Sequence, residues 1–276
     1  AISILPIRDM RIFAGEVVLA DIFTEGRLIL GVGRGNFRYE MERLGIPMEE
    51  TRARFDESLA VLQALLEREE VSWDGDYYKF DPLTVMPRPI NPGGPPMMMA
   101  AVKPDAIYHC ARQGYHVQTT PLAGSKSYLQ EQVDAFNRGK EEAGDVGEDL
   151  TLTLLRVGFM CHSEMEKRER IQMAHAFLGR FDNVHEGAGI VDNGMVRALP
   201  RRQPIDQVAK NALIGMKQEM IDKLSVFDEM GIDRIILNVN FGCDPHETLD
   251  SIQYFAEEVM PHFADEKDGD IRKIVA

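Results

Sequence analysis

The sequence has few of the features that mark disulfide-rich, zinc-binding or nucleic-acid-binding proteins. Its 276 residues contain three cysteines, Cys110, Cys161 and Cys243, which lie far apart and form no CxxC pair. This spacing disfavours a disulfide framework and a zinc site, and it favours a reducing compartment. Lys and Arg number 31 against 45 Asp and Glu, and the formal net charge of −14 opposes general attraction to nucleic acid or an anionic membrane.

Long apolar runs and common enzyme motifs are also absent. No run of about 18 apolar residues indicates a membrane span, and no basic start followed by an apolar region indicates a signal peptide. We therefore expect a cytoplasmic protein with no membrane partner. HExxH, GxSxG and Walker patterns do not occur, which argues against a metal site and against triad chemistry.

Short apolar runs alternate with helical patterns, which predicts successive βα units around a parallel sheet. The six runs are 2–5, 28–32, 97–102, 117–120, 152–161 and 234–239. Two of the predicted helices have a clear apolar face, carried by Phe55, Leu59, Leu62 and Leu66 in one and by Leu249, Ile252, Phe255 and Val259 in the last. A single α/β domain over 1–276 fits this length.

Two segments depart from the βα pattern. Asp74-Gly75, flanked by aromatic and β-branched residues, predicts a β-hairpin near 71–80. The longest irregular stretch, near 183–204, is rich in Gly, Asp, Asn and Arg. A loop of this length is either disordered or functional, and we expect a mobile lid at the face where substrate enters.

A glycine-rich turn follows the second predicted strand. Gly31, Gly33 and Gly35 stand just past that strand with Arg34 among them. Glycines let a backbone approach a ligand closely, and an arginine offers a planar fork of donors for phosphate. The GxGxG spacing is not a dinucleotide fingerprint, so a tight turn with a solvated arginine explains it equally well on spacing alone.

The order of several motifs resembles bacterial luciferase and its relatives. Glu25-Gly-Arg27, the turn Gly31–Gly35, Leu44-Gly-Ile-Pro47, Thr51-Arg-Ala53 and the closing run 251–263 stand in the family's order. The resemblance covers essentially the whole chain. It implies an α/β (β/α)8 TIM barrel with strands three to eight present, the alignment beginning within the third strand and the first two βα units absent.

The resemblance also implies that reduced flavin mononucleotide (FMN) binds at the carboxyl ends of the strands. Arg34 matches the family's phosphate-binding arginine, and Arg52 matches a second one at the start of the next helix. Gly33, beside Gly35, stands where luciferase itself carries a reactive cysteine. Lys103 stands where relatives place a small hydroxyl residue, and it either donates to the phosphate in its place or points to water.

Three further residues are expected near the flavin ring or its substrate. Phe37, Thr119 and Thr120 lie at the ends of predicted strands. None of the seven histidines replaces the one that luciferase uses near its flavin, so we assign no catalytic base.

The resemblance implies a flavin-dependent monooxygenase that oxidises a small organic substrate, such as an aldehyde or ketone, with dioxygen. A separate flavin reductase would supply reduced FMN, and a homo-oligomer, a dimer, is expected. Two alternatives remain open. One is a deazaflavin-dependent oxidoreductase on the same barrel, and the other is a relative that binds flavin without catalysis.

Overall fold

The computed structural model describes residues 2–120, 126–185, 189–200 and 203–264. The chain divides into two compact units, which are described separately below. The first contains the described residues within 1–121, 126–152 and 184–190, and the second those within 122–125, 153–183 and 191–276. In the described part, no helix is long and apolar enough to cross a membrane.

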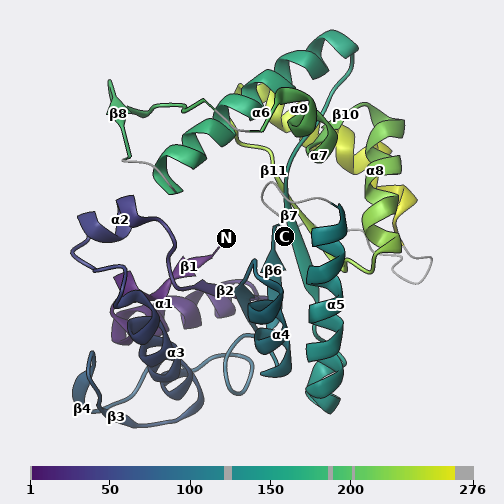
Figure 1. Cartoon of the computed structure of the whole chain (residues 1–276). Coiled ribbons are helices and arrows are strands. Elements are labelled where there is room, and N and C mark those ends of the chain that lie inside the picture. The colour runs from purple at the N-terminus through teal and green to yellow at the C-terminus, as the bar shows by residue number, and fades with distance from the viewer. Residues whose placement is uncertain (1, 121–125, 186–188, 201–202, 265–276) are drawn as a thin grey trace. The chain divides into compact units, whose positions relative to one another are not determined.

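A parallel sheet organises the first unit (Figure 1). Its strands, in spatial order, are β1 (Ser3–Ile4), β2 (Leu30–Gly33), β5 (Met97–Ala100) and β6 (His116–Thr119). Ile4 pairs with Gly33, Val32 with Met99, and Ala100 with Gln118. All four strands overlap runs that the sequence predicts: β1 and β5 lie inside theirs, β2 ends one residue after 28–32, and β6 begins one residue before 117–120.

Helices follow the strands of this unit and cover one face of the sheet. They are α1 (Met10–Phe23), α2 (Arg38–Arg43), α3 (Thr51–Glu67), α4 (Pro104–Arg112) and α5 (Lys126–Glu142), with the short 3-10 helices η1 (Leu5–Ile7) and η2 (Gly144–Gly147). Val32 and Met99 pack with residues of α1 and α3, including Leu62, in one buried cluster. Because side chains alternate along a strand, Gly33 and Ala100 lie on the opposite face.

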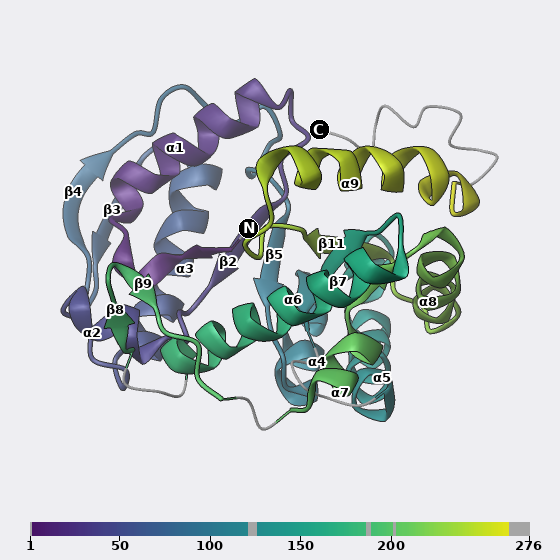
Figure 2. The ribbon, with the colours of Figure 1, turned by 90° about the horizontal axis from the view of Figure 1, so that it is seen from above.

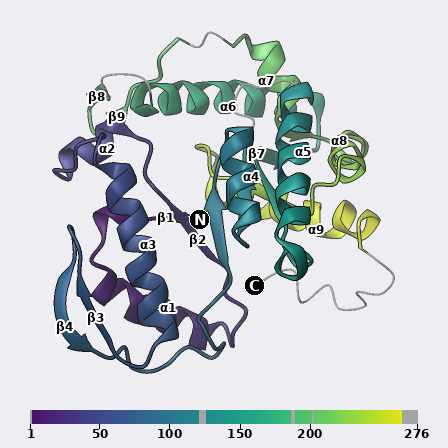
Figure 3. The same ribbon diagram turned by 60° about the horizontal axis from the view of Figure 1, so that its bottom comes forward.

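The hairpin near 71–80 consists of β3 (Val71–Asp74) and β4 (Lys79–Leu83) and lies alongside α3 (Figure 3). Glu57 on α3 fixes its turn, because the carboxylate accepts hydrogen bonds from the backbone N–H groups of Asp76, Tyr77 and Tyr78. Trp73 donates its indole N–H to the same carboxylate at 3.2 Å.

The second unit is built on β7 (Leu152–Met160), which pairs in parallel with two strands. β11 (Arg234–Asn238) pairs along Thr153–Val157, and β10 (Leu213–Gly215) pairs along Gly158–Met160. The sequence predicts β7 and β11 but not β10 as a strand. Three residues are too few for a periodic signal, and β10 forms because all three are buried against β7.

Four helices complete this unit: α6 (Glu164–His185), α7 (Ile205–Asn211), α8 (Lys217–Glu229) and α9 (Pro245–Glu258), followed by η3 (Met260–His262). Figure 2 shows these four helices. Phe255 of α9 and Val259, which follows the helix, pack with Met160 and Leu237 in one cluster. Leu249 and Ile252, expected on the same buried face, are 64% and 44% exposed. The helix instead buries Ser251, whose hydroxyl accepts a hydrogen bond from Met160 N.

The segment 183–204, expected as a lid, begins inside α6 and contains a small hairpin, β8 (Val191–Asp192) with β9 (Met195–Val196). Asn183 is buried and donates to the carbonyl of Arg197 at 2.8 Å. Residues 186–188 and 201–202 of this stretch lie outside the described residues. Its mobility stays a prediction.

Candidate functional site

The carboxyl ends of the four strands of the first unit meet at one edge. The register places Ile4, Gly33, Ala100 and Gln118 in one row across this edge. Arg34 follows Gly33 directly, and Lys103 follows Ala100 by three residues on the neighbouring strand. The fold therefore brings two cations that are 69 positions apart in the sequence to adjacent strand ends.

The glycine-rich turn after β2 is tightly packed. Gly35 has a positive φ of 85°, and a Cβ atom there would lie 2.8 Å from Met41 Sδ and 2.9 Å from Ile4 Cγ2. A Cβ atom on Gly33 would lie 2.8 Å from Ile2 Cγ2. Both glycines are buried whereas Arg34 between them is exposed, so the turn presents this guanidinium to solvent.

The basic residues of the edge differ in their partners. Arg34 and Lys103 are exposed, and neither forms an ion pair or a side-chain hydrogen bond within the described part of the chain. Arg52 bonds Asp56 through Nε at 2.9 Å, and its side chain is 73% exposed. Arg54 pairs with Glu50 at 3.0 Å. Within the described part, Arg34 and Lys103 thus have no carboxylate partner, whereas Arg52 and Arg54 are each paired with one.

Lys103 also occupies the N-cap position of α4. Pro104 is the first helical residue, and no side chain caps the helix. Ile107 N donates to Lys103 O, so the first turn of α4 begins at this residue. Uncapped N–H groups at a helix N-terminus attract anions. Asp105 in the same turn competes with such an anion.

The residues expected beside the flavin ring occupy different environments. Thr119 is 2% exposed, and its hydroxyl has no hydrogen-bond partner within the described residues. Thr120 is half-buried. Phe37 is half-buried as well, and its ring meets that of His185 edge-on, with the centroids 5.9 Å apart. Their contact with a substrate stays a prediction.

His185 is a residue of this edge that the sequence does not reveal. Asn36 Nδ2 lies 2.8 Å from His185 Nε2, although the two residues are 149 positions apart. Gly189 packs against the Tyr39 ring just beyond the same turn, where a Cβ atom would lie 1.6 Å from Tyr39 Cδ2. His185 and Gly189, which both belong to the first unit, therefore lie against Asn36 and Tyr39 just after the turn that carries Arg34, and no motif near His185 signals this contact.

The thiols offer no reactive nucleophile. Burial raises the pKa of Cys110 to about 11, an effect that the nearby Arg52 partly opposes. Burial raises the pKa of Cys161 to about 12 and also raises that of Cys243. The described residues contain no cluster of His, Cys, Asp and Glu that could hold a metal ion.

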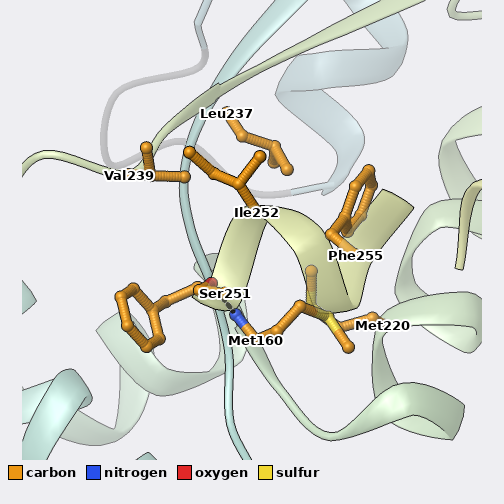
Figure 4. A pocket seen from close by; sticks show the side chains of 8 residues that line it. Met160, Met220, Leu237, Val239, Ser251, Ile252 and Phe255 are labelled. Atoms are coloured by element: carbon orange, nitrogen blue, oxygen red, sulfur yellow. Dashed lines mark hydrogen bonds between the residues drawn. The ribbon is translucent and has the colours of Figure 1, made fainter. Parts of the chain in front are cut away.

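Two cavities lie away from Arg34 and Lys103. One, of about 190 Å³, lies within the second unit and is lined mainly by apolar side chains of β7, β11, α8 and α9 (Figure 4). Its one polar side chain, Ser251, already accepts a hydrogen bond from Met160 N. The other, of about 470 Å³, lies in the first unit between the start of α1, α3 and the β3–β4 hairpin. Its basic side chains are paired with carboxylates, as Arg8 is with Glu16, so this cavity offers no unpaired cation to an anion.

The residues of the edge fit a flavin phosphate. A dianion needs cations without competing partners and backbone donors that no side chain occupies. Arg34 and Lys103 meet the first requirement and the uncapped start of α4 meets the second.

Comparison with known sequences identifies related enzymes. The flavin-dependent trigonelline monooxygenase, oxygenase component, of Acinetobacter baylyi is 27% identical over 264 residues, which cover 92% of this chain and 72% of that protein. The F420-dependent glucose-6-phosphate dehydrogenase of Nakamurella multipartita is 25% identical over 241 residues, covering 86% and 68%. The relatives thus include enzymes that depend on different cofactors.

Solved structures agree on the fold. The monooxygenase RslO1 from Streptomyces bottropensis matches 94% of this chain and 76% of its own, with a TM-score of 0.78 and 24% identity. The oxygenating constituent of 3,6-diketocamphane monooxygenase from Pseudomonas putida, a type II Baeyer-Villiger monooxygenase solved in complex with FMN, covers 94% and 78%, with a TM-score of 0.69 and 16% identity.

The family model described as luciferase-like monooxygenase matches residues 1–234. This match confirms the resemblance, the barrel fold class and the flavin-dependent monooxygenase class expected from the sequence. The chain belongs to the luciferase-like monooxygenase family.

Proposed function

We propose that this chain is the oxygenase component of a two-component monooxygenase that uses reduced FMN and dioxygen to oxidise a small organic substrate. The observation that carries the proposal is the pair of unpartnered cations, Arg34 and Lys103, at adjacent strand ends beside an uncapped helix. Such a site suits the phosphate of FMN. Family membership and the trigonelline monooxygenase relative support the oxygenase role.

Each residue has a distinct role in this proposal. Arg34 and Lys103 bind the phosphate, and Arg52 joins them when it releases Asp56. Gly33 and Gly35 keep the turn close to the cofactor. When bound, reduced flavin supplies two electrons, so that one atom of dioxygen enters the substrate and the other leaves as water. Phe37, Thr119 and Thr120 border the ring or the substrate.

The proposed reaction needs a second protein that supplies reduced FMN. A separate flavin reductase delivers reduced FMN, in keeping with a relative described as an oxygenase component. Assembly as a homodimer and a cytoplasmic location belong to the same proposal, and each is open to direct measurement in the native host.

A second candidate is hydride transfer with a deazaflavin coenzyme. The similarity to an F420-dependent glucose-6-phosphate dehydrogenase favours it specifically. The two candidates differ in their need for dioxygen and in the coenzyme that binds more tightly.

Binding measurements test the site and the cofactor together. We expect FMN to bind more tightly than riboflavin, which lacks the phosphate, and more tightly than F420. Arg34→Ala should weaken FMN binding by about 1.5–3 kcal/mol, or about 10- to 100-fold, the scale of a charged hydrogen bond. Arg68→Ala is the matched control, because Arg68 is exposed at the end of α3, away from the strand edge.

Turnover tests the reaction. The purified chain, mixed with a flavin reductase, NADH, FMN and a panel of aldehydes and ketones, should incorporate one atom of ¹⁸O from labelled dioxygen into the product. Anaerobic turnover with reduced F420 and no oxygen incorporation would replace this proposal with the deazaflavin alternative. FMN affinity unchanged in Arg34→Ala and Lys103→Ala would remove the phosphate site.

A further inference from the structure

A polar side chain is buried on the apolar face of α5. Gln132 is fully buried, between Leu129 and Phe136 on the same helix face. Burying an amide lowers stability unless its hydrogen bonds with water are replaced, so a buried glutamine needs a specific hydrogen bond within the protein.

That bond goes to the turn that carries Lys103. Gln132 Nε2 donates to the carbonyl oxygen of Val102 at 2.6 Å. Tyr128, one helical turn earlier on α5, donates its hydroxyl to the same oxygen at 3.3 Å. Val102 immediately precedes Lys103, the N-cap of α4. Two side chains of α5 therefore fix the peptide group that joins the end of β5 to the phosphate-facing turn.

The helix that supplies these donors is held firmly against α4. A Cβ atom on Gly139 of α5 would lie 2.4 Å from the carbonyl oxygen of Tyr108, so the two helix backbones approach closely at this point. The Tyr108 hydroxyl donates to Glu142 at 2.6 Å. Because α5 cannot shift independently of α4, Gln132 holds the turn in one position relative to the helix that follows it.

Of the two polar atoms of the Gln132 amide, only Nε2 forms a hydrogen bond within the described residues. Gln132 Oε1 is buried and has no hydrogen-bond partner within the described residues. The Thr119 hydroxyl is also buried and unpartnered, and Thr119 lies one position beyond Gln118 on the strand beside Ala100. Leaving Gln132 Oε1 unpaired lowers stability. A role in packing alone does not explain this cost, because leucine would fill the same apolar face without it.

We propose that Gln132 is a positioning residue for the flavin phosphate, which it serves by fixing the Val102 carbonyl and thereby aiming Lys103 and the first N–H groups of α4. This inference rests on the proposed function, in which Lys103 binds that phosphate. The residue acts through the turn and does not touch the cofactor. Loss of Gln132 should therefore reduce the contribution of the phosphate to FMN affinity and leave the contribution of the flavin ring unchanged.

The ratio of the riboflavin Kd to the FMN Kd isolates the phosphate contribution. Equilibrium fluorescence titration should give a large ratio for the wild type and a ratio about tenfold lower for Lys103→Ala. Gln132→Leu should lower the ratio by about three- to tenfold with riboflavin affinity unchanged. In Lys103→Ala/Gln132→Leu the ratio should fall by less than the product of the two single effects, because Gln132 acts partly through Lys103.

Two further variants make the result decisive. Gln130→Leu is the matched control, since Gln130 lies on the exposed face of the same helix and bonds only Asp134 within the described part. Tyr128→Phe removes the second donor to Val102 and should lower the ratio in the same direction by a smaller factor. This variant serves as the test if Gln132→Leu does not fold.

The outcomes separate the inference from the proposed function. If Lys103→Ala lowers the ratio and both Gln132→Leu and Tyr128→Phe leave it at the wild-type value, the positioning role is wrong and the phosphate site stands. If Gln132→Leu weakens FMN and riboflavin equally, Gln132 is merely structural and the inference fails. If the wild type does not distinguish FMN from riboflavin, the proposed function itself is wrong.

Discussion

Glu57 should hold the β3–β4 hairpin in place through its charge. Its carboxylate accepts from three successive backbone N–H groups, at 3.1 Å from Asp76, 3.0 Å from Tyr77 and 2.9 Å from Tyr78, and from the indole of Trp73. Hydrogen bonds to a charged group contribute about 1.5–3 kcal/mol each when protected, and less here because the turn is partly exposed to water. We expect Glu57→Ala to cost about 2–4 kcal/mol.

Glu57→Gln should lower the free energy of unfolding nearly as much, although glutamine and glutamate side chains have the same shape. The amide keeps one acceptor oxygen and turns an NH₂ group, which cannot accept, toward backbone donors. Trp73 is the only tryptophan of the chain, so its fluorescence reports the hairpin while circular dichroism reports the whole fold. The Trp73 transition should shift to lower urea in both variants. Glu69→Gln, at an exposed site nearby, is the control, and Glu57 variants that match it would refute the reasoning.

Three further predictions concern other parts of the chain. Lys223→Met should cost about 1–3 kcal/mol in urea unfolding, because it leaves the carbonyls that Lys223 Nζ binds, such as Ala212 O at 2.8 Å, without a donor. Burial lowers the pKa of Lys223 below 10.5. Between the lowered pKa and pH 10.5 the unfolded state binds more protons than the folded state, so the free energy of unfolding of the wild type should rise with pH in this range relative to that of the variant. Cys161, whose pKa burial raises to about 12, should resist a thiol reagent at pH 8 until the protein unfolds, and rapid labelling of the folded state would contradict this. Gly189→Ala should separate residues 189–190 from Tyr39, because a Cβ atom would strike the Tyr39 ring and because the backbone φ of +62° is unfavourable for alanine. Hydrogen exchange in α2, which contains Tyr39, should then become faster, and unchanged exchange would count against this contact.

The sequence predicts the repeating elements of the fold well. All six apolar runs contain a strand, because a strand buried on both faces must be continuously apolar and such runs stand out against the helices between them. β10 is missed because three residues cannot establish a period. The exposure of Leu249 is also missed, since spacing identifies an apolar face but not how much of that face the neighbouring elements cover.

The candidate site is only partly readable from the sequence. The family motif identifies Arg34 and Arg52 equally, yet only the structure shows that Arg52 is bonded to Asp56 whereas Arg34 has no such partner. The approach of His185 to Asn36 depends on where a 22-residue helix ends, and local sequence patterns carry no information about such long-range contacts.

Several violations of local preference lie at the strand edge of the first unit. A lysine at an N-cap opposes the helix dipole, and Lys103 forms no ion pair with a carboxylate in the described part, although Asp105 in the first turn of α4 partly offsets the conflict. Arg52 in the first turn of α3 has the same conflict and relieves it through Asp56. Gln132 and Thr119 each bury an oxygen without a partner close to the same turn. Buried atoms without a partner also occur elsewhere in the described part, at Asp21, Thr153, Arg156 and Arg170. The strand edge differs from those places because it combines such atoms with an exposed, unpaired lysine at an uncapped helix start. A phosphate site requires this combination, because a cation placed to meet a dianion cannot also be paired within the protein.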